Sequence, residues 1–192
     1  LGYYTKGQEF PNVLVSNINS SIQAVMFPAY AKNQDNRPQV KQIMRRALVT
    51  SSFLVFPAMA GLAAVAEPLV ILLLTEKWLI AVPFLQIFCA VYALWPIHTA
   101  NLQAINALGR SDVFLKLEIV KKIVGVSMLA VTVPIGIYAM ALGMIVTGII
   151  ATFINAYPNQ LLLDYSFMEQ WRDLMPALIL SLVMCGVVYS VL

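Results

Sequence analysis

Residues 137–157 read IYAMALGMIVTGIIATFINAY, a segment that is almost wholly apolar and carries no charge. About 20 such residues are needed for an α-helix to cross a lipid bilayer, so this segment predicts a transmembrane helix. The whole chain has the same character, since 60% of its 192 residues are hydrophobic and 11% are charged, with a mean hydropathy of +0.81. Soluble domains are about half apolar and about a quarter charged. The chain is therefore predicted to lie in a membrane.

Further apolar segments of similar length predict an all-α fold, a polytopic transmembrane bundle of about six membrane helices. A short helix at the membrane surface is also expected after Glu67, where Pro68 suits the first turn of a new helix. Gly109 is placed to end the third membrane helix, Ser111 to cap the fourth, and Pro158 to close the fifth. The predicted segments are 10–31, 47–66, the surface helix 68–74, 82–104, 111–133, 137–157 and 171 to the end.

Lysine and arginine residues gather in alternate gaps between these segments. One gap holds five of them, another holds four, and Arg172 lies in a third, whereas the intervening gaps hold only Lys77. Short loops rich in Lys and Arg stay on the cytoplasmic side of a membrane. We therefore expect the loops near residues 32–46, 110–122 and 161–172 to be cytoplasmic. The loops at 76–77 and 134–136 are expected to lie outside.

The sequence carries no signature of an enzyme, a cofactor or a metal site. It contains no Gly-rich phosphate loop, no nucleophile beside a base and no metal-ligand spacing, and His98 is its only histidine. Cys89 and Cys185 both lie within apolar runs and are interpreted as small packing residues. The cations flank apolar helices and are not interleaved with aromatic residues, so nucleic acid is not expected as a partner. A membrane protein that is not an enzyme is predicted.

The first helix carries a stripe of polar residues at helical spacing, formed by Asn12, Ser16, Asn19 and Gln23. Such a stripe would be costly against lipid chains and must face another helix or a water-filled cavity. Ser and Asn commonly form hydrogen bonds between membrane helices, which is one interpretation. The other is the wall of a polar translocation path, because neutral amides and hydroxyls can both donate to and accept from sugars.

The third helix contains Pro96, which is expected to kink it because proline removes a backbone donor. His98 and Asn101 follow, three residues apart, and are expected to share a face. His98 is interpreted either as a hydrogen-bonded packing residue or as a proton-coupling or substrate-sensing group. His98 and Asn101 are therefore further candidates for the substrate path.

Four cations are candidates for a phosphate site at the cytoplasmic mouth. They are Arg45 and Arg46 on the second helix and Lys121 and Lys122, expected on the first turns of the fourth. Lys and Arg are the usual phosphate partners. The alternative is that these side chains extend toward anionic lipid head groups, which the sequence favours because nothing in it turns them inward.

Four blocks of sequence follow one another along the chain, and they read LGYYTKGQEFPNVLV, FPAYAKNQDN, AEPLVILLLTEKWLIAVPFLQIF and NALGRSD. Their most telling parts are Phe27-Pro28, Glu67-Pro68-Leu69, Lys77-Trp78 and Ala107-Leu108-Gly109-Arg110. In this order the blocks resemble polysaccharide flippases of the Wzx-like kind, which share a superfamily with the MATE exporters and the lipid II flippases. The resemblance extends from residue 1 to about residue 171. These motifs are structural and do not identify binding residues.

The resemblance implies a protein of two lobes around a central cavity that works by alternating access. Such proteins move an undecaprenyl-pyrophosphate-linked oligosaccharide across the bacterial inner membrane for lipopolysaccharide or exopolysaccharide synthesis. The lipid-linked oligosaccharide, membrane lipids and other polysaccharide-assembly proteins are the implied partners. The chain begins at Leu1 and stops at Leu192 inside an apolar run, so a fragment of a longer protein is expected. Residues 1–158 would form part of the C-terminal lobe, and 159–192 a cytoplasmic loop and a further helix.

Two other functions are alternatives to the flippase. A MATE-type exporter of organic cations would need an acidic residue deep in a helix, whereas Glu67 and Glu118 are expected near helix ends. A membrane-embedded polysaccharide polymerase or ligase would need a long outside loop with catalytic Arg or His residues, and the expected outside loops are very short.

Overall fold

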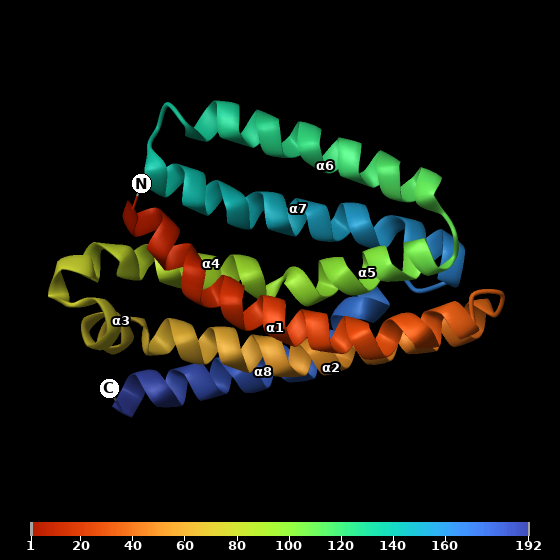
Figure 1. The fold of residues 1–192 in the computed structure, drawn as a ribbon, viewed down its shortest axis with the longest axis horizontal. Helices are drawn as coiled ribbons and strands as arrows, with labels where there is room; N and C mark the ends of the chain where they lie inside the picture. The colour runs from red at the N-terminus through yellow and green to blue at the C-terminus, as the bar shows by residue number, and fades with distance from the viewer. Residues whose placement is uncertain (1, 192) are drawn as a thin grey trace.

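The computed structural model describes residues 2–191, and these form a bundle of helices with no strand among them (Figure 1). Leu1 and Leu192, on which the expectation of a fragment rested, lie outside the described residues. The all-α prediction is confirmed. A short 3-10 helix, Glu76–Ala81, precedes α4. The α-helices are α1 Gly2–Lys32, α2 Arg37–Ala64, α3 Ala66–Leu74, α4 Val82–Ala93, α5 Trp95–Ala107, α6 Ser111–Thr132, α7 Ile137–Leu163 and α8 Phe167–Val191.

Four segments of the described chain are long and apolar enough to cross a membrane. They are Arg37–Ala64, Glu76–Ala107, Ile137–Leu163 and Phe167–Ser190. The other two long helices, α1 with 31 residues and α6 with 22, run alongside them (Figure 1) but are more polar or more charged. Their length is sufficient, at about 1.5 Å per residue, to span a hydrocarbon core of about 30 Å.

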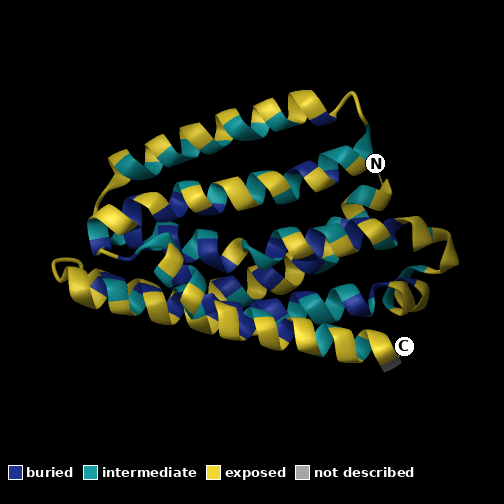
Figure 2. Ribbon diagram, turned by 180° about the vertical axis from the view of Figure 1, so that it is seen from behind, coloured by how far each residue is buried: buried dark blue, intermediate teal, exposed yellow. Residues whose placement is uncertain are grey.

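The helices at the centre of the bundle pack closely, whereas α6 at one edge makes few contacts. The α2 and α8 helices pack along one another, and α1 lies obliquely across the bundle (Figure 1). Buried side chains form two clusters, one around Met44, Leu48 and Tyr165 and the other around Val15 and Phe88. The α6 helix packs mainly on α7, and Thr132 is its only buried residue, so most of its surface is open (Figure 2).

The three connections expected to be cytoplasmic lie together at one end of the bundle. These are the α1–α2, α5–α6 and α7–α8 connections, at the right of Figure 1. The α3 region and the α6–α7 connection lie at the opposite end. The grouping of the basic loops at one end is thus confirmed, and their cytoplasmic orientation stays a prediction.

Two predicted interruptions of the third membrane helix, the kink at Pro96 and the end at Gly109, are present in the structure. The third membrane segment is divided at Leu94 into α4 and α5, with Pro96 in the first turn of α5. Gly109 ends α5 with a φ of +68°, a left-handed conformation in which a side chain would be strained. The kink at Pro96 and the helix end at Gly109 are therefore confirmed. The short helix expected over 68–74 is confirmed as α3.

Two other helix boundaries were predicted wrongly. Pro158 does not close α7, which continues to Leu163 and ends at Asp164 in the left-handed conformation. Pro158 is buried, and the Asn159 side chain next to it is bound to α5, so tertiary contacts outweigh the lost backbone hydrogen bond. The predicted boundary at 158/159 therefore falls inside a helix, and the division into two parts stays a prediction.

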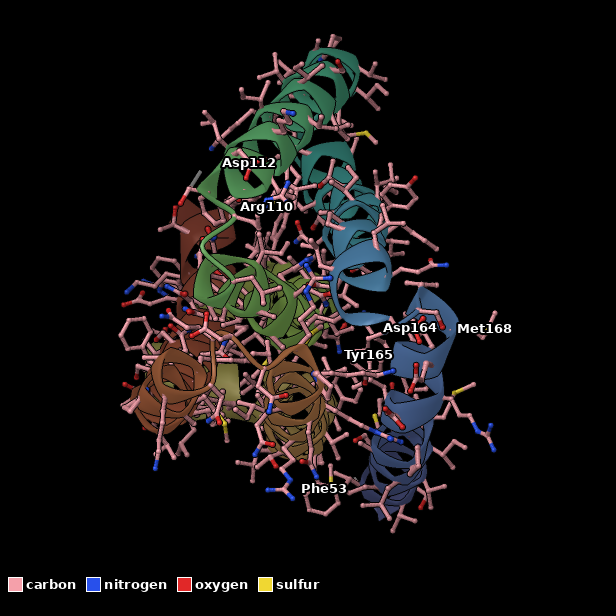
Figure 3. The ribbon with its side chains drawn as sticks, turned by 90° about the vertical axis from the view of Figure 1, so that its right-hand side faces the viewer. Phe53, Arg110, Asp112, Asp164, Tyr165 and Met168 are labelled. Atoms are coloured by element: carbon pink, nitrogen blue, oxygen red, sulfur yellow. The ribbon has the colours of Figure 1, made fainter. Side chains whose placement is uncertain are left out.

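Ser111 is also not the cap of α6. The N-cap residue is Arg110, and it makes no capping side-chain hydrogen bond. Its guanidinium instead donates to both carboxylate oxygens of Asp112, at 2.9 and 3.0 Å (Figure 3). This pairing fixes an acidic side chain in the first turn of α6, where the helix dipole favours a negative charge.

Candidate functional site

The polar stripe of α1 is divided between two environments. Asn12 and Ser16 are exposed, whereas Asn19 is buried and Gln23 is half-buried. The four residues lie close to one line along the helix, but α1 crosses the bundle obliquely (Figure 1). The same face of α1 is therefore open in its N-terminal half and covered by α2 and α5 further along.

The open half of this face extends beyond the two predicted residues. Ser20 is exposed one turn beyond Ser16, and Asn17 and Ser21 are exposed beside it. The hydroxyls of Ser20 and Ser21 both donate to the backbone oxygen of Asn17, and Ser16 donates to Val13. We call Asn12, Ser16, Asn17, Ser20 and Ser21 the open polar face of α1. Its amides and its remaining hydroxyl acceptor sites are available to another molecule or segment.

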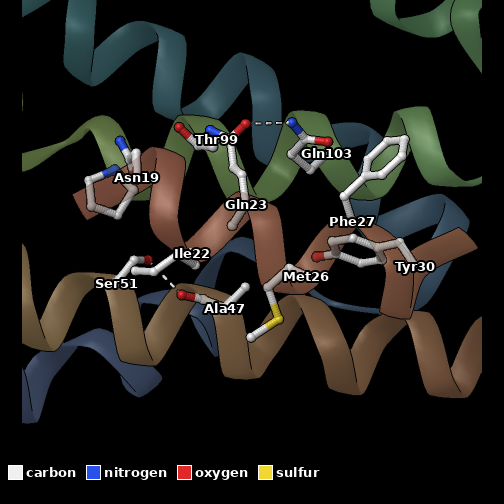
Figure 4. A pocket seen from close by; sticks show the side chains of 12 residues that line it. Asn19, Ile22, Gln23, Met26, Phe27, Tyr30, Ala47, Ser51, Thr99 and Gln103 are labelled. Carbon is white, nitrogen blue, oxygen red and sulfur yellow. Dashed lines mark hydrogen bonds between the residues drawn. The ribbon is translucent and has the colours of Figure 1, made fainter. Parts of the chain in front are cut away.

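The buried half of the stripe lines a small cavity between α1, α2 and α5 (Figure 4). Gln103 of α5 donates to the Gln23 side-chain oxygen at 3.1 Å, and Asn19 is only 4% exposed. The cavity holds about 20 Å³, which is enough for one water molecule. The Asn19 Nδ2 atom has no partner among the described residues and lines this cavity. Gln23 therefore joins α1 to α5 in this structure, and Asn19 is enclosed beside the cavity.

His98 and Asn101 both contact α7, so the prediction that they share a face is confirmed. The Asn155 Nδ2 atom lies 3.1 Å from His98 Nδ1, and the Asn159 Nδ2 atom donates to Asn101 Oδ1 at 2.8 Å. The His98 tautomer that accepts at Nδ1 fits this contact. In this structure the two residues join α5 to α7.

A third buried amide extends this contact to α8. The Asn101 Nδ2 atom donates to Gln170 Oε1 at 2.9 Å, and Gln170 Nε2 returns a hydrogen bond to Asn101 Oδ1 at 3.3 Å. Asn101, Asn159 and Gln170 are each 1% exposed or less. Sequence reasoning missed Asn155, Asn159 and Gln170. The signal for the first two was the spacing of four between amides in an otherwise apolar helix, which marks a buried contact.

Lys121 and Lys122 do not lie on the first turns of α6, as predicted. Lys121 is ten residues after Ser111, roughly 15 Å along a helix of roughly 33 Å. Both lysines line a groove of about 580 Å³ between α6, α7 and the start of α1. The Lys121 ammonium pairs with the Glu118 carboxylate at 2.5 Å. Glu118 itself lies roughly 10 Å into α6, deeper than expected.

Arg45 binds α8 and is not free to hold a phosphate in this structure. Its guanidinium lies 2.5 Å from Asp173 Oδ1, and the Tyr165 hydroxyl donates to Asp173 Oδ2 at 2.7 Å. Burial, followed by the nearby Asp173 carboxylate, raises the pKa of Tyr165, so its hydroxyl remains a donor. Lys41 reinforces the contact through Glu169, at 3.2 Å. Arg46 is exposed and makes no ion pair within residues 2–191.

Arg45→Gln is therefore expected to destabilise the packing of α8 on α2, by roughly 1 kcal/mol because the arginine is half exposed. Thermal unfolding of the purified full-length protein would measure this as a lower midpoint. Arg46→Gln, one residue away, is the matched control and should leave the midpoint unchanged. Equal effects of the two substitutions would contradict the assigned role of Arg45.

No metal centre is evident in the part of the chain that the structure describes, because no three His, Cys, Asp or Glu side chains gather there. The polar groups available for chemistry are the open polar face of α1 and the charged groups in the groove beside α6. Neither pairs a nucleophile with a base. Both can bind polar or charged parts of a ligand.

Comparison with known proteins finds similarity to proteins that are named for polysaccharide biosynthesis. Residues 1–83 match a family model described as "Polysaccharide biosynthesis protein". An uncharacterized membrane protein in the cps region of Klebsiella pneumoniae is 28% identical over 177 residues, which are 88% of this chain and 36% of that protein. This chain is a relative of polysaccharide biosynthesis proteins. The resemblance carried by the four quoted sequence blocks is thereby confirmed.

Two further relatives have more specific names. The teichuronic acid biosynthesis protein TuaB of Bacillus subtilis is 29% identical over 58% of this chain and 23% of its own length. The lipopolysaccharide biosynthesis protein WzxC of Escherichia coli is 28% identical over 73% of this chain and 29% of its own length. The matched region thus spans about a quarter to a third of each of these three relatives. No solved structure gives a significant match. Together with the four apolar spans, the relatives show a multi-pass membrane protein.

Proposed function

We propose that the full-length protein containing this chain transports a lipid-linked oligosaccharide across the cytoplasmic membrane for polysaccharide synthesis. The observation that carries the proposal is the open polar face of α1, which lies on a bundle that exposes many large apolar side chains. The names of TuaB and WzxC support the class of product, since one acts in teichuronic acid and the other in lipopolysaccharide synthesis.

The open polar face is unsuited to contact with lipid. Its asparagine and serine side chains would lose hydrogen bonds to water if they faced acyl chains. The face must therefore line a water-filled path or contact another segment of the longer protein. The groups are neutral, with amides that donate and accept and hydroxyls that still accept, so they suit the hydroxyls of a sugar chain and impose no charge requirement. A polysaccharide transporter needs such a surface to solvate different sugars.

In the proposed mechanism, the sugar and its pyrophosphate enter a polar path while the prenyl tail stays in lipid. The end of the bundle that carries the basic loops would face the cytoplasm, where the substrate is made. Movement of two lobes would then expose the path to the opposite side in turn. The protein performs no covalent chemistry in this scheme. Membrane lipids and other polysaccharide-assembly proteins would be its neighbours.

The double substitution Ser16→Leu and Ser20→Leu tests the role of the open polar face. In the full-length protein it should reduce surface polysaccharide by about tenfold or more, because two sites that solvate sugar become apolar. Membrane insertion should be unchanged, since Leu favours the bilayer. Both quantities can be measured in cells that lack the endogenous gene, by polysaccharide staining and by quantifying the protein in membranes.

Ser127→Leu provides the control, because Ser127 is exposed on α6 outside the groove. This variant should assemble normal amounts of polysaccharide. If the double variant also supports normal assembly, the open polar face is a packing surface and the proposal loses its main support.

A further inference from the structure

A pocket of about 340 Å³ lies between the start of α2 and the end of α7, at the end of the bundle that carries the basic loops. It is lined by Arg37, Pro38 and Lys41 of α2, by residues 161–163 of α7, which are all leucine, and by Asp164. Figure 3, which views the bundle from this end, shows Asp164 at the turn between α7 and α8. The pocket is separate from the open polar face of α1 and from the groove beside α6.

The pocket lies where two candidate membrane spans end on the same side of the bundle. Arg37 is the first residue of the span Arg37–Ala64, and Asp164 follows the last residue of the span Ile137–Leu163. Each span is long enough to cross a hydrocarbon core of about 30 Å, so the ends that meet here lie at the level of the lipid head groups. Leu161 is 72% exposed, and it lies just inside the end of its span, where a lipid acyl chain passes. The pocket is therefore positioned to meet the head group of a lipid.

The pocket contains two opposite charges that have no ion-pair partner within residues 2–191. The Arg37 guanidinium and the Asp164 carboxylate are both exposed, and no ion pair joins them to each other or to another side chain. The Lys41 ammonium, in contrast, is already bound to the Glu169 carboxylate at 3.2 Å and to the backbone oxygen of Asp164. The pocket thus offers one free cation and one free anion at separate places on its wall.

We propose that this pocket binds the head group of a phosphatidylethanolamine molecule from the surrounding bilayer. The lipid phosphate accepts hydrogen bonds from Arg37, the lipid ammonium donates to Asp164, and one acyl chain lies along Leu161. A guanidinium suits a phosphate because its N–H groups form a planar fork. A carboxylate suits a primary ammonium, which carries three N–H donors. This inference goes beyond the proposed function and does not depend on it.

The charges of the pocket select against two other common phospholipids. The anionic head group of phosphatidylglycerol would meet Arg37, but it has no cation for Asp164 and would be repelled by it. Phosphatidylcholine carries both charges, but its methyl groups remove the N–H donors and hold the positive nitrogen farther from the carboxylate. Lys41 does not alter this balance, because Glu169 compensates its charge. Of the three lipids, phosphatidylethanolamine alone completes both contacts.

Native mass spectrometry of the purified full-length protein, titrated with single lipids in detergent, tests the inference. The probes are dioleoyl phosphatidylethanolamine, its N-methyl and N,N-dimethyl derivatives, and the dioleoyl forms of phosphatidylcholine and phosphatidylglycerol. Affinity should fall along the methylation series, and phosphatidylcholine and phosphatidylglycerol should each bind roughly fivefold or more weakly than phosphatidylethanolamine, because a charge-assisted hydrogen bond is lost. Equal affinity for all five lipids would indicate annular contact only and would overturn the inference.

Two substitutions separate the two contacts. Asp164→Asn should abolish the preference for phosphatidylethanolamine over phosphatidylcholine and should strengthen the binding of phosphatidylglycerol, because the carboxylate that distinguishes these lipids is gone. Asparagine is tolerated in the left-handed conformation that residue 164 adopts, with a φ of +52°, so this variant should fold. Arg37→Gln should weaken the binding of phosphatidylethanolamine and of phosphatidylglycerol by roughly fivefold, because both lose the guanidinium that holds the phosphate.

Asp35→Asn and Arg172→Gln are the matched controls, since both residues are exposed and neither lines the pocket. Each should keep the lipid preference of the unaltered protein, and thermal unfolding of all four variants checks that they are folded. A preference for phosphatidylethanolamine that survives Asp164→Asn, or that the controls lose to the same extent, would refute the assigned contacts. Because the measurement involves neither transport nor polysaccharide, its failure would leave the proposed function untouched.

Discussion

Gly7→Val is expected to lower the unfolding midpoint of the full-length protein more than any other single substitution on α1. A Cβ atom at position 7 would lie 2.7 Å from Phe84 Cβ and 2.8 Å from the Leu85 backbone nitrogen. Backbone atoms cannot rotate away, so α1 would have to separate from α4. Overpacking of this kind costs about 1 to 3 kcal/mol of stability. Because the new side chain would meet backbone atoms, the cost of Gly7→Val should be at the upper end of this range or above it. Thermal unfolding in detergent would measure the loss.

Gly186→Val is the matched control for this substitution. Gly186 lies within α8, and a Cβ atom there would meet nothing within 4 Å. The same chemical change should therefore leave the midpoint close to that of the unaltered protein. If Gly7→Val proves as well tolerated as Gly186→Val, α1 does not pack on α4 as closely as the structure shows.

Asn101→Leu is expected to have the second large effect, because it removes the centre of the buried contact among α5, α7 and α8. The Gln170 Oε1 atom would lose its donor, Asn101 Nδ2, at a cost of about 1 to 3 kcal/mol for a buried group left without a partner. The Asn159 and Gln170 nitrogens would lose Asn101 Oδ1 but keep backbone acceptors at Asn101 and Tyr165. The unfolding midpoint should fall, and α8 should become more accessible to protease at its start.

A triple variant separates lost hydrogen bonds from lost packing. Replacing Asn101, Asn159 and Gln170 together with Leu removes all three amides, so none is left unpaired by the loss of the others. Replacement of every partner by an apolar group can be nearly neutral, and stability should therefore recover a substantial part of the single-variant loss. Asn106→Leu, at an exposed position of α5, is the control for the single change and should have little effect. A triple variant less stable than Asn101→Leu would contradict this account.

Local chemistry predicted much of the fold but only part of the candidate site. Pro96 and Gly109 act through their own backbone restrictions, so their effects were readable from the sequence. Pro158 obeys the same local rule, yet α7 continues past it, because Asn159 is held by Asn101 across the helix contact. That partner lies 58 residues away in the chain, and no local pattern identifies it.

For the site residues, too, the sequence could not predict contacts with distant parts of the chain. The spacing of Asn12, Ser16, Asn19 and Gln23 placed them on one helical stripe but could not show where α2 and α5 would cover it. Arg45 and Arg46 are adjacent and chemically alike, but only Arg45 lies against Asp173. The depth of Lys121 in α6 was readable from the sequence, since the helix begins at Ser111 as predicted, and placing it on the first turns was an error of local reasoning. Only the groove that Lys121 lines required the positions of α7 and α1.

The amino-acid sequence alone determined that this chain lies in a membrane, which segments are helical and which loops share an end of the bundle. These properties follow from hydropathy and from charge, which act on each segment separately. The tertiary structure decided which polar groups are enclosed and which remain open. That choice depends on the oblique crossing of α1 over the bundle and on the loose attachment of α6 (Figures 1 and 2). A helix presents all its faces to its surroundings, and only its neighbours determine which of them can meet a ligand.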